Sequence, residues 1–187
     1  MITRTEALEF LNEKVENKNI IKHMLATEAL MREMAKKFNG NEDEWAMAGL
    51  LHDGDYSPNV PHEKQGIQVT EWLREKGYEI PENIAYAMAA HNWSNTKVEP
   101  KSKMDWTLFC GDNLTGLIVA SALVLPTKKL SDLTCESVLK RFKESSFAKG
   151  TRREDIAKCQ EKLGFPLEKF VKITLESMQS ISAELGL

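Results

Sequence analysis

Four histidines and two aspartates are the residues of this chain whose types suit chemistry at a bound metal ion. They are, in chain order, His23, His52, Asp53, His62, His91 and Asp112. Imidazole nitrogens combined with carboxylate oxygens, without thiolates, suit divalent ions such as zinc, iron or manganese. Taken singly, each also has a structural interpretation: His23 as a hydrogen-bonded residue inside a helix, His62 as a surface residue. Spacing along the chain does not by itself show that the six converge.

Asp112 is the hardest of these residues to explain without a partner. It lies in the apolar segment FCGDNLTGLIVA, which is expected to form a largely buried helix. A buried carboxylate that has neither a cation nor several hydrogen-bond donors is strongly destabilising. We therefore expect either a metal ion or a hydrogen-bond network to hold Asp112.

The elements that position these residues are predicted to be helices throughout, which makes the fold class all-α. Apolar residues recur at about 3.6 residues, the period of an amphipathic helix. The predicted helices cover residues 4–16, 20–38, 42–52, 62–76, 81–90, 104–125, 134–143, 151–163 and 167–185. The helix from Met104 to Leu125 is the most apolar and is expected to be central.

Local signals support several helix ends. Three pairs have the spacing of a capping box, namely Thr3 with Glu6, Asn41 with Glu44, and Thr151 with Glu154. Gly40 is the expected residue just after the second helix. The segment GDYSPNVP, residues 54–61, is predicted to be a loop that leaves His52 and Asp53 accessible at the end of the third helix.

Composition excludes several classes of protein. The 187 residues include 25 Lys and Arg against 28 Asp and Glu, a net charge of −3, without the basic stripe of a nucleic-acid-binding domain. The three cysteines, Cys110, Cys135 and Cys159, form no CxxC pair and are typical of reduced thiols. The first residues carry charges and lack the apolar core of a signal peptide, which favours a cytoplasmic protein. The apolar stretch from Leu114 to Leu125 is interpreted as too short for a bilayer, so no membrane contact is expected.

The chain resembles the HD superfamily of metal-dependent phosphohydrolases, which are all-α proteins named for an adjacent His-Asp pair. His23 in an early helix, His52 and Asp53 in LLHDGDY, and Asp112 in a later helix carry the resemblance. It spans about residues 20–125 and implies an HD-type helical bundle with additional C-terminal helices from about 130 to 187. We expect one domain over residues 1–187.

The resemblance implies that His23, His52, Asp53 and Asp112 bind one divalent ion. It also implies that His62 and His91 hold a second ion, with Asp53 bridging the two. The extra histidine expected beside His91 is Asn92 here, which leaves the second site weaker, completed by water, or absent. The resemblance thus implies one or two divalent ions, for which iron, manganese, zinc, cobalt, nickel and magnesium are the candidates. A bound ion would activate a water molecule for attack on a phosphoryl group, with His52 and Asp53 as the catalytic pair.

Further roles are predicted for residues close to these ligands in the sequence. Asp55 and Asn113 are candidates to orient the ligands, although Asp55 has two alternatives, a direct ligand or a turn residue. Lys64 and Arg153, with its neighbour Arg152, are candidate phosphate contacts. Trp93 is a candidate to stack on a nucleobase, or else a packing residue.

The sequence thus predicts a metal-dependent phosphohydrolase whose partner is a small phosphorylated molecule, such as a nucleotide. The type of phosphate ester or anhydride is left open. One alternative is a regulatory module with the same fold that binds a nucleotide without hydrolysing it. Another is a structural helical protein whose histidines are incidental. A homo-oligomer is left open.

Overall fold

Every regular element of the computed structural model, which describes residues 2–187, is helical. The α-helices are α1 (Arg4–Lys14), α2 (Lys18–Lys37), α3 (Glu42–Leu51), α4 (Gln68–Glu75), α5 (Glu82–His91), α6 (Trp93–Thr96), α7 (Lys103–Leu123), α8 (Cys135–Lys143), α9 (Arg153–Ala157), α10 (Leu167–Ser180) and α11 (Ser182–Leu185). The shorter elements are the 3₁₀ helices η1 (His62–Lys64) and η2 (Leu130–Asp132) and the π-helix η3 (Cys159–Leu163). No strand occurs among residues 2–187, so the all-α prediction is confirmed.

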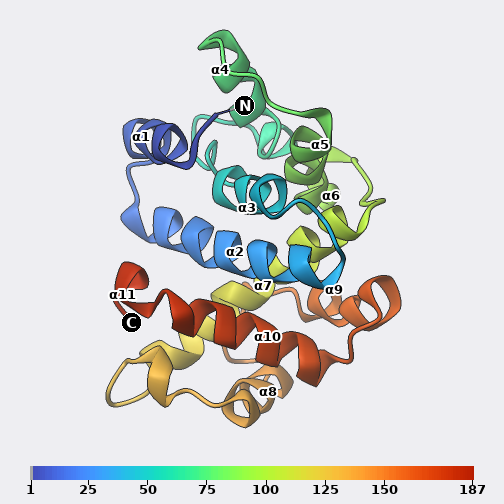
Figure 1. Ribbon diagram of the computed structural model, residues 1–187. Helices are drawn as coiled ribbons and strands as arrows, with labels where there is room; N and C mark the ends of the chain where they lie inside the picture. Colours follow the sequence, from blue (N-terminus) through green and yellow to red (C-terminus); the bar gives the residue numbers. More distant parts are fainter. Residues whose placement is uncertain (1) are drawn as a thin grey trace.

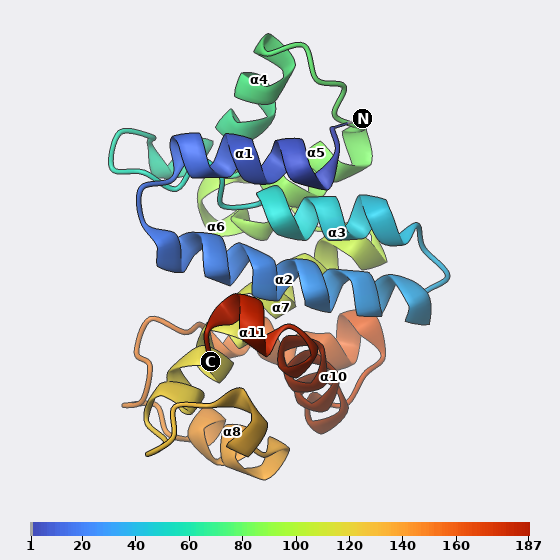
Figure 2. The same cartoon turned by 60° about the vertical axis from the view of Figure 1, so that its left-hand side comes forward.

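Helix α2 divides the molecule into two groups of helices. In Figures 1 and 2, α1, α3 and α4 lie on one side of α2, and α8, α10 and α11 lie on the other. Helix α3 packs on α2 from the first side and α10 packs on it from the second. The buried hydrophobic side chains, from Ile2 near the N-terminus to Leu185 near the C-terminus, form one continuous core.

Helix α7 is central, as expected, because α2, α5, α8, α9 and α10 all contact it. It passes behind α2 in Figure 1 and links the two groups. The whole helix, 21 residues long, reaches the length and composition of a membrane-spanning helix, a test that a buried core helix also passes. Other helices cover most of it, since 67% of its most apolar window is buried inside the protein.

The capping signals near the N-terminus form as predicted. Thr3 and Glu6 make a reciprocal capping box at the start of α1. The side chain of Asn41 accepts hydrogen bonds from the backbone of Asp43 and Glu44 at the start of α3. After α2, however, it is Asn39 that adopts the left-handed conformation, with φ of 52°, in place of the expected Gly40. Asparagine tolerates this region better than most residues with a side chain.

The predicted helix over residues 62–76 is wrong, because the chain breaks between η1 and α4. Gly66 has a φ of +89°, which favours glycine and ends the helical path. The buried carboxylate of Asp55 accepts hydrogen bonds from the backbone N–H groups of Gly66 and Val69. Helix α4 keeps the amphipathic pattern that was predicted for residues 62–76. The segment is divided because Asp55, which lies outside it in the sequence, accepts hydrogen bonds from its backbone.

The C-terminal helices are also more broken than predicted. The expected capping box of Thr151 with Glu154 does not form, since α9 begins after Arg152 without a side-chain cap. The predicted helix over 151–163 is α9 followed by the π-helix η3, and the helix over 167–185 is interrupted at Ile181, between α10 and α11. The buried residues Ile156, Cys159 and Leu163 keep an apolar face in spite of these changes of helix type.

Candidate metal centre

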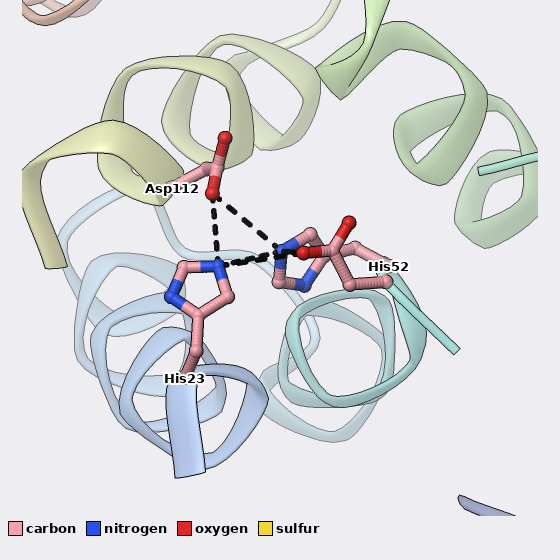
Figure 3. Close-up of side chains that lie close together, drawn as sticks. His23, His52 and Asp112 are labelled. Atoms are coloured by element: carbon pink, nitrogen blue, oxygen red, sulfur yellow. Dashed lines mark hydrogen bonds and ion pairs between the residues drawn. The ribbon is translucent and has the colours of Figure 1, made fainter. Parts of the chain in front are cut away.

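Three helices bring together four of the predicted ligand residues. His23 comes from α2, His52 and Asp53 follow the end of α3, and Asp112 lies in α7. One ligand atom from each of the four lies within 4.8 Å of the other three. In Figure 3, His23, His52 and Asp112 point toward a common centre from different elements. Because α2 packs against both α3 and α7, the helix packing itself produces this convergence.

The distances define a small centre of nitrogen and oxygen atoms. His23 Nε2 lies 2.9 Å from Asp112 Oδ1 and 3.2 Å from His52 Nε2. Asp53 Oδ2 lies 3.7 Å from His23 Nε2 and 3.6 Å from His52 Nε2. His52 Nε2 is also 3.7 Å from Asp112 Oδ1. These atoms surround one point rather than forming separate pairs.

The Nδ1 atoms of the two imidazoles are occupied by oxygen acceptors. His52 Nδ1 donates to the carbonyl of Gly49 at 2.8 Å. His23 Nδ1 lies 3.2 Å from the hydroxyl oxygen of Thr115. That hydroxyl donates its own hydrogen bond to the backbone carbonyl of Asp112 at 2.8 Å. The Thr115 oxygen therefore accepts from His23. In this tautomer both Nε2 atoms present lone pairs toward the centre.

Burial and charge distinguish the two carboxylates from ordinary surface acids. The side chains of Asp53 and Asp112 are only 16% and 21% exposed. Burial raises the pKa of Asp112, but hydrogen bonding and charge from His23 and His52, which act when their Nε2 atoms carry a proton in place of a cation, outweigh it and hold that pKa well below the usual range. Burial likewise raises the pKa of Asp53, yet the charge of His52 and the hydrogen bond with His91 lower it overall. Both groups are therefore ionised at neutral pH.

His91 lies on the side of the Asp53 carboxylate that faces away from His23 and His52. Its Nε2 is 3.4 Å from Asp53 Oδ1, whereas Oδ2 of the same carboxylate faces His23 and His52. His91 Nδ1 donates to the carbonyl of Met88, which leaves Nε2 as the atom turned toward Asp53. Burial lowers the pKa of His91, but the hydrogen bond with Asp53 raises it overall. The two oxygens of Asp53 thus face two groups of imidazoles, as a bridging carboxylate would.

His62 is less closely associated with the centre. It is exposed in η1, and its Nδ1 lies 3.3 Å from the side-chain oxygen of Gln65. Asn92, which stands where a further histidine was expected, donates its amide to the carbonyls of His62 and Gln65. Asn92 therefore attaches the His62 segment to the end of α5 beside His91.

The two predicted orienting residues have different surroundings. The amide of Asn113 lies 3.4 Å from Asp112 Oδ2, and its carbonyl oxygen accepts from the backbone N–H of Arg152 at 3.0 Å. Asp55 is buried but contacts backbone groups of Gly66 and Val69 instead of an imidazole, so the expected direct contact with a ligand is not found. Asp55 is connected with the centre through Gly66, from whose backbone N–H it accepts. Gly66 lies against the imidazole of His91, since a Cβ added at Gly66 would be only 3.0 Å from His91 Cε1.

The predicted substrate contacts are not gathered at the centre. Lys64 is exposed, with Nζ 3.6 Å from Glu71. Trp93 packs against the rings of Trp106 and Phe109 at centroid distances of 6.2 and 6.0 Å. The guanidinium of Arg153 donates to five backbone carbonyls, those of Phe142, Thr151, Arg141, Glu144 and Phe147. The phosphate contact of Arg153 stays a prediction, and the structure gives its guanidinium backbone carbonyls as partners instead.

Two features at the centre were missed in the sequence. One is Thr115, whose position three residues after Asp112 on a helix places both on one face. The other is a pocket of about 340 Å³ beside His23 and Asp112, completed by Asn113, Gly116 and residues 148–151. Lys149 is among these lining residues. The spacing of Thr115 from Asp112 was a signal that the sequence offered, whereas no local pattern connects Lys149 with Asp112, which lies 37 residues earlier in the chain.

A family model of the HD domain matches residues 20–114 of this chain, which is more than half of its length. The matched segment contains all six residues of the predicted ligand set. Neither the curated proteins nor the solved structures include a match to the chain.

Proposed function

This chain belongs to the HD domain family, and from that membership we propose that it is a metal-dependent phosphohydrolase. Its substrate is a small phosphorylated molecule such as a nucleotide. The observation that supports the proposal most directly is the convergence of acceptor atoms from His23, His52, Asp53 and Asp112 within 4.8 Å. Lone pairs and negative charges packed this closely repel one another unless a cation lies among them.

The donor set fits a divalent ion better than a proton. With Nδ1 of each histidine donating elsewhere, the two Nε2 atoms and two carboxylates offer nitrogen and oxygen ligands only. Iron, manganese, zinc, cobalt and nickel accept such a mixture, and magnesium accepts its oxygen ligands. Two aspartates also supply the charge that neutralises one divalent cation.

The residues of the chain have distinct tasks in the proposed reaction. His23, His52 and Asp112 would hold one divalent ion, while Asp53 would face both this ion and a second one near His91. A divalent ion held there supplies Lewis acidity, which activates water and neutralises the phosphoryl oxygens. Thr115 and the Gly49 carbonyl keep His23 and His52 in the required tautomer. The adjoining pocket of about 340 Å³ gives a substrate access to the Asp112 side of the centre.

Elemental analysis combined with a phosphate-release assay tests this function. The protein is purified without chelator, loaded in parallel with manganese, iron, cobalt or nickel, and given a generic chromogenic phosphoester and a panel of nucleotides. We expect bound metal and phosphate release in the native protein. Asp53→Ala is expected to lose both, because it removes the carboxylate that faces every imidazole of the centre. Asp132→Ala, an exposed site in η2, serves as the matched control.

The outcomes separate the alternative functions. Metal binding together with nucleotide binding, but without phosphate release, would favour a regulatory module over an enzyme. Absence of metal even after reloading would leave the histidines without a common role and would contradict both. Full metal content in Asp53→Ala would exclude the ligand set proposed here.

A further inference from the structure

Helix α7 together with His23 of α2 forms one wall of the pocket beside the metal centre, and the segment between α8 and α9 forms the other. His23, Asp112, Asn113 and Gly116 line one wall, and residues 148–151, Ala-Lys-Gly-Thr, line the other. We propose that Lys149 binds the phosphate of the substrate as it enters this pocket, with residues 148–151 as a substrate-recognition loop. This inference rests on the proposed phosphohydrolase function and names a binding residue for it.

The loop is held in place from within the C-terminal region. Arg153 donates to the carbonyls of Phe142, Glu144 and Phe147 at 2.7, 2.9 and 2.6 Å. A single guanidinium therefore hydrogen-bonds the backbone that precedes the loop at three residues. A cation–π contact of Arg141 with the ring of Phe147, at 4.8 Å, adds to this arrangement. The loop is therefore shaped before any ligand arrives, which reduces the entropy lost on binding.

A separate contact fixes the loop against the metal centre. The side-chain oxygen of Asn113 accepts from the backbone N–H of Arg152 at 3.0 Å. The Arg152 side chain donates to Ser94 Oγ at 2.9 Å and pairs with Asp155 at 2.8 Å. Because Asn113 is adjacent to Asp112 in α7, this bond joins the end of the loop to the helix that presents a predicted ligand. Lys149 is thereby kept on the Asp112 side of the centre.

The charge of Lys149 is available to a ligand. Lys149 is exposed and forms no ion pair or hydrogen bond with any other residue in the described range 2–187. The pocket wall opposite carries the carboxylate of Asp112 and no basic side chain other than the imidazole of His23. A divalent ion at Asp112 would attract the phosphate group from one wall, and Lys149 would supply a second positive charge from the facing wall. A lysine serves this purpose as a compact, mobile point charge.

The arrangement also limits the kind of substrate. A pocket of about 340 Å³ is at the lower end of the range for small-molecule sites, which begins at roughly 300 Å³. We therefore expect compact phosphomonoesters and nucleotides to bind, with most contacts made to the phosphate.

Phosphate binding by two variants of Lys149, compared with control variants elsewhere, tests the inference. Inorganic phosphate is titrated into the metal-loaded protein at constant ionic strength, and metal content is measured in the same samples. We expect Lys149→Ala to weaken phosphate binding and raise KM about tenfold or more, the effect of losing one charge-assisted hydrogen bond. We expect Lys149→Arg to keep most of the affinity. Metal content and the thermal unfolding midpoint should stay at native values, because Lys149 is exposed and outside the ligand set.

Matched controls make the result specific. Lys143→Ala removes an equally exposed lysine from the end of α8 that does not line the pocket, and we expect native phosphate affinity. Gly116→Leu narrows the pocket from the α7 side, where a Cβ meets no atom within 4 Å. It should weaken phosphate binding while metal content is retained.

The failure of the inference is distinguishable from that of the proposed function. If the native protein hydrolyses phosphoesters while Lys149→Ala behaves like Lys143→Ala, the inference is overturned and the phosphohydrolase function stands. If the native protein binds metal but neither binds phosphate nor releases it, the proposed function fails and the inference fails with it. Phosphate release by the native protein, together with a tenfold loss of phosphate affinity in Lys149→Ala that Lys149→Arg and Lys143→Ala do not share, supports both.

Discussion

Helix α2 carries a buried carboxylate, Glu28, and a candidate metal ligand, His23, and the charge of the nearby carboxylates is balanced differently in these two regions. Glu28 of α2, whose side chain is 8% exposed, receives the guanidinium of Arg4 at 2.7 and 3.0 Å. Five residues earlier, His23 faces Asp53 and Asp112. Those two carboxylates form no ion pair with any Lys or Arg of residues 2–187, and their partners are imidazoles.

The difference shows where the chain supplies its own cation and where it does not. An arginine satisfies Glu28 permanently, so that region needs nothing from solution. At the centre of His23, His52, Asp53 and Asp112 the carboxylates face only imidazoles, whose Nδ1 atoms are engaged elsewhere, and these four residues could hold a metal ion. A region that stabilises the fold and a region prepared to bind a cation thus lie on the same helix.

The largest expected effect that separates the two regions is stabilisation by metal. An ion that binds only the folded state at a hundredfold excess over its Kd adds about 2.7 kcal/mol to the free energy of unfolding. We expect thermal unfolding of the chelator-treated protein to shift upward on addition of manganese or zinc, and to return after renewed chelation. Asp112→Ala should abolish the shift, whereas Arg4→Ala should retain it. A shift of equal size in Asp112→Ala would contradict the comparison.

A smaller effect is expected from Thr115, which acts on the centre only through His23. Thr115→Val removes the acceptor of the His23 Nδ1 proton, so the imidazole loses its fixed tautomer. Removal of such an orienting partner weakens metal affinity by about 10- to 100-fold. Titration with a competing chelator measures this change.

Thr115→Ser is the matched control, because it keeps the hydroxyl and should bind metal almost as the native protein does. Equal affinity in the valine and serine variants would show that the hydroxyl does not orient His23.

The smallest expected effect is on the free energy of unfolding when the ion pair of Arg4 with Glu28 is broken. Arg4→Ala leaves the Glu28 carboxylate without a partner, but the Arg4 side chain is 45% exposed, so water compensates in part. We expect a loss of about 1 kcal/mol, measured by urea unfolding, because partly exposed pairs contribute little. Metal content should be unchanged. The double variant Arg4→Ala with Glu28→Ala isolates the coupling between the two side chains.

Features that depend on neighbouring residues could be predicted well. The capping box of Thr3 and Glu6, the cap at Asn41, and the end of α5 at His91 all follow from spacings of a few residues. The resemblance to the HD superfamily, carried by His23, the adjacent His52 and Asp53, and Asp112, implied the set whose ligand atoms the structure brings within 4.8 Å.

Features that depend on distant partners could not be predicted. Asp55 binds backbone groups 11 and 14 residues away and breaks the helix expected over 62–76. Arg153 was expected at phosphate, yet loop carbonyls take up its donors. Neither outcome has a local signature, because an acceptor or a donor finds its partner only after the helices have packed.

The sequence by itself therefore determined most of the helices, several of the residues that cap them, and a set of histidines and aspartates suited to binding a metal ion. The tertiary structure decided which of these meet. Packing of α2 against α3 and α7 brings together His23, His52, Asp53 and Asp112, and closure of the segment before α9 places Lys149 beside them. The reason is physical: helix propensity and capping act over one or two turns, whereas convergence of side chains depends on how whole helices bury their apolar faces.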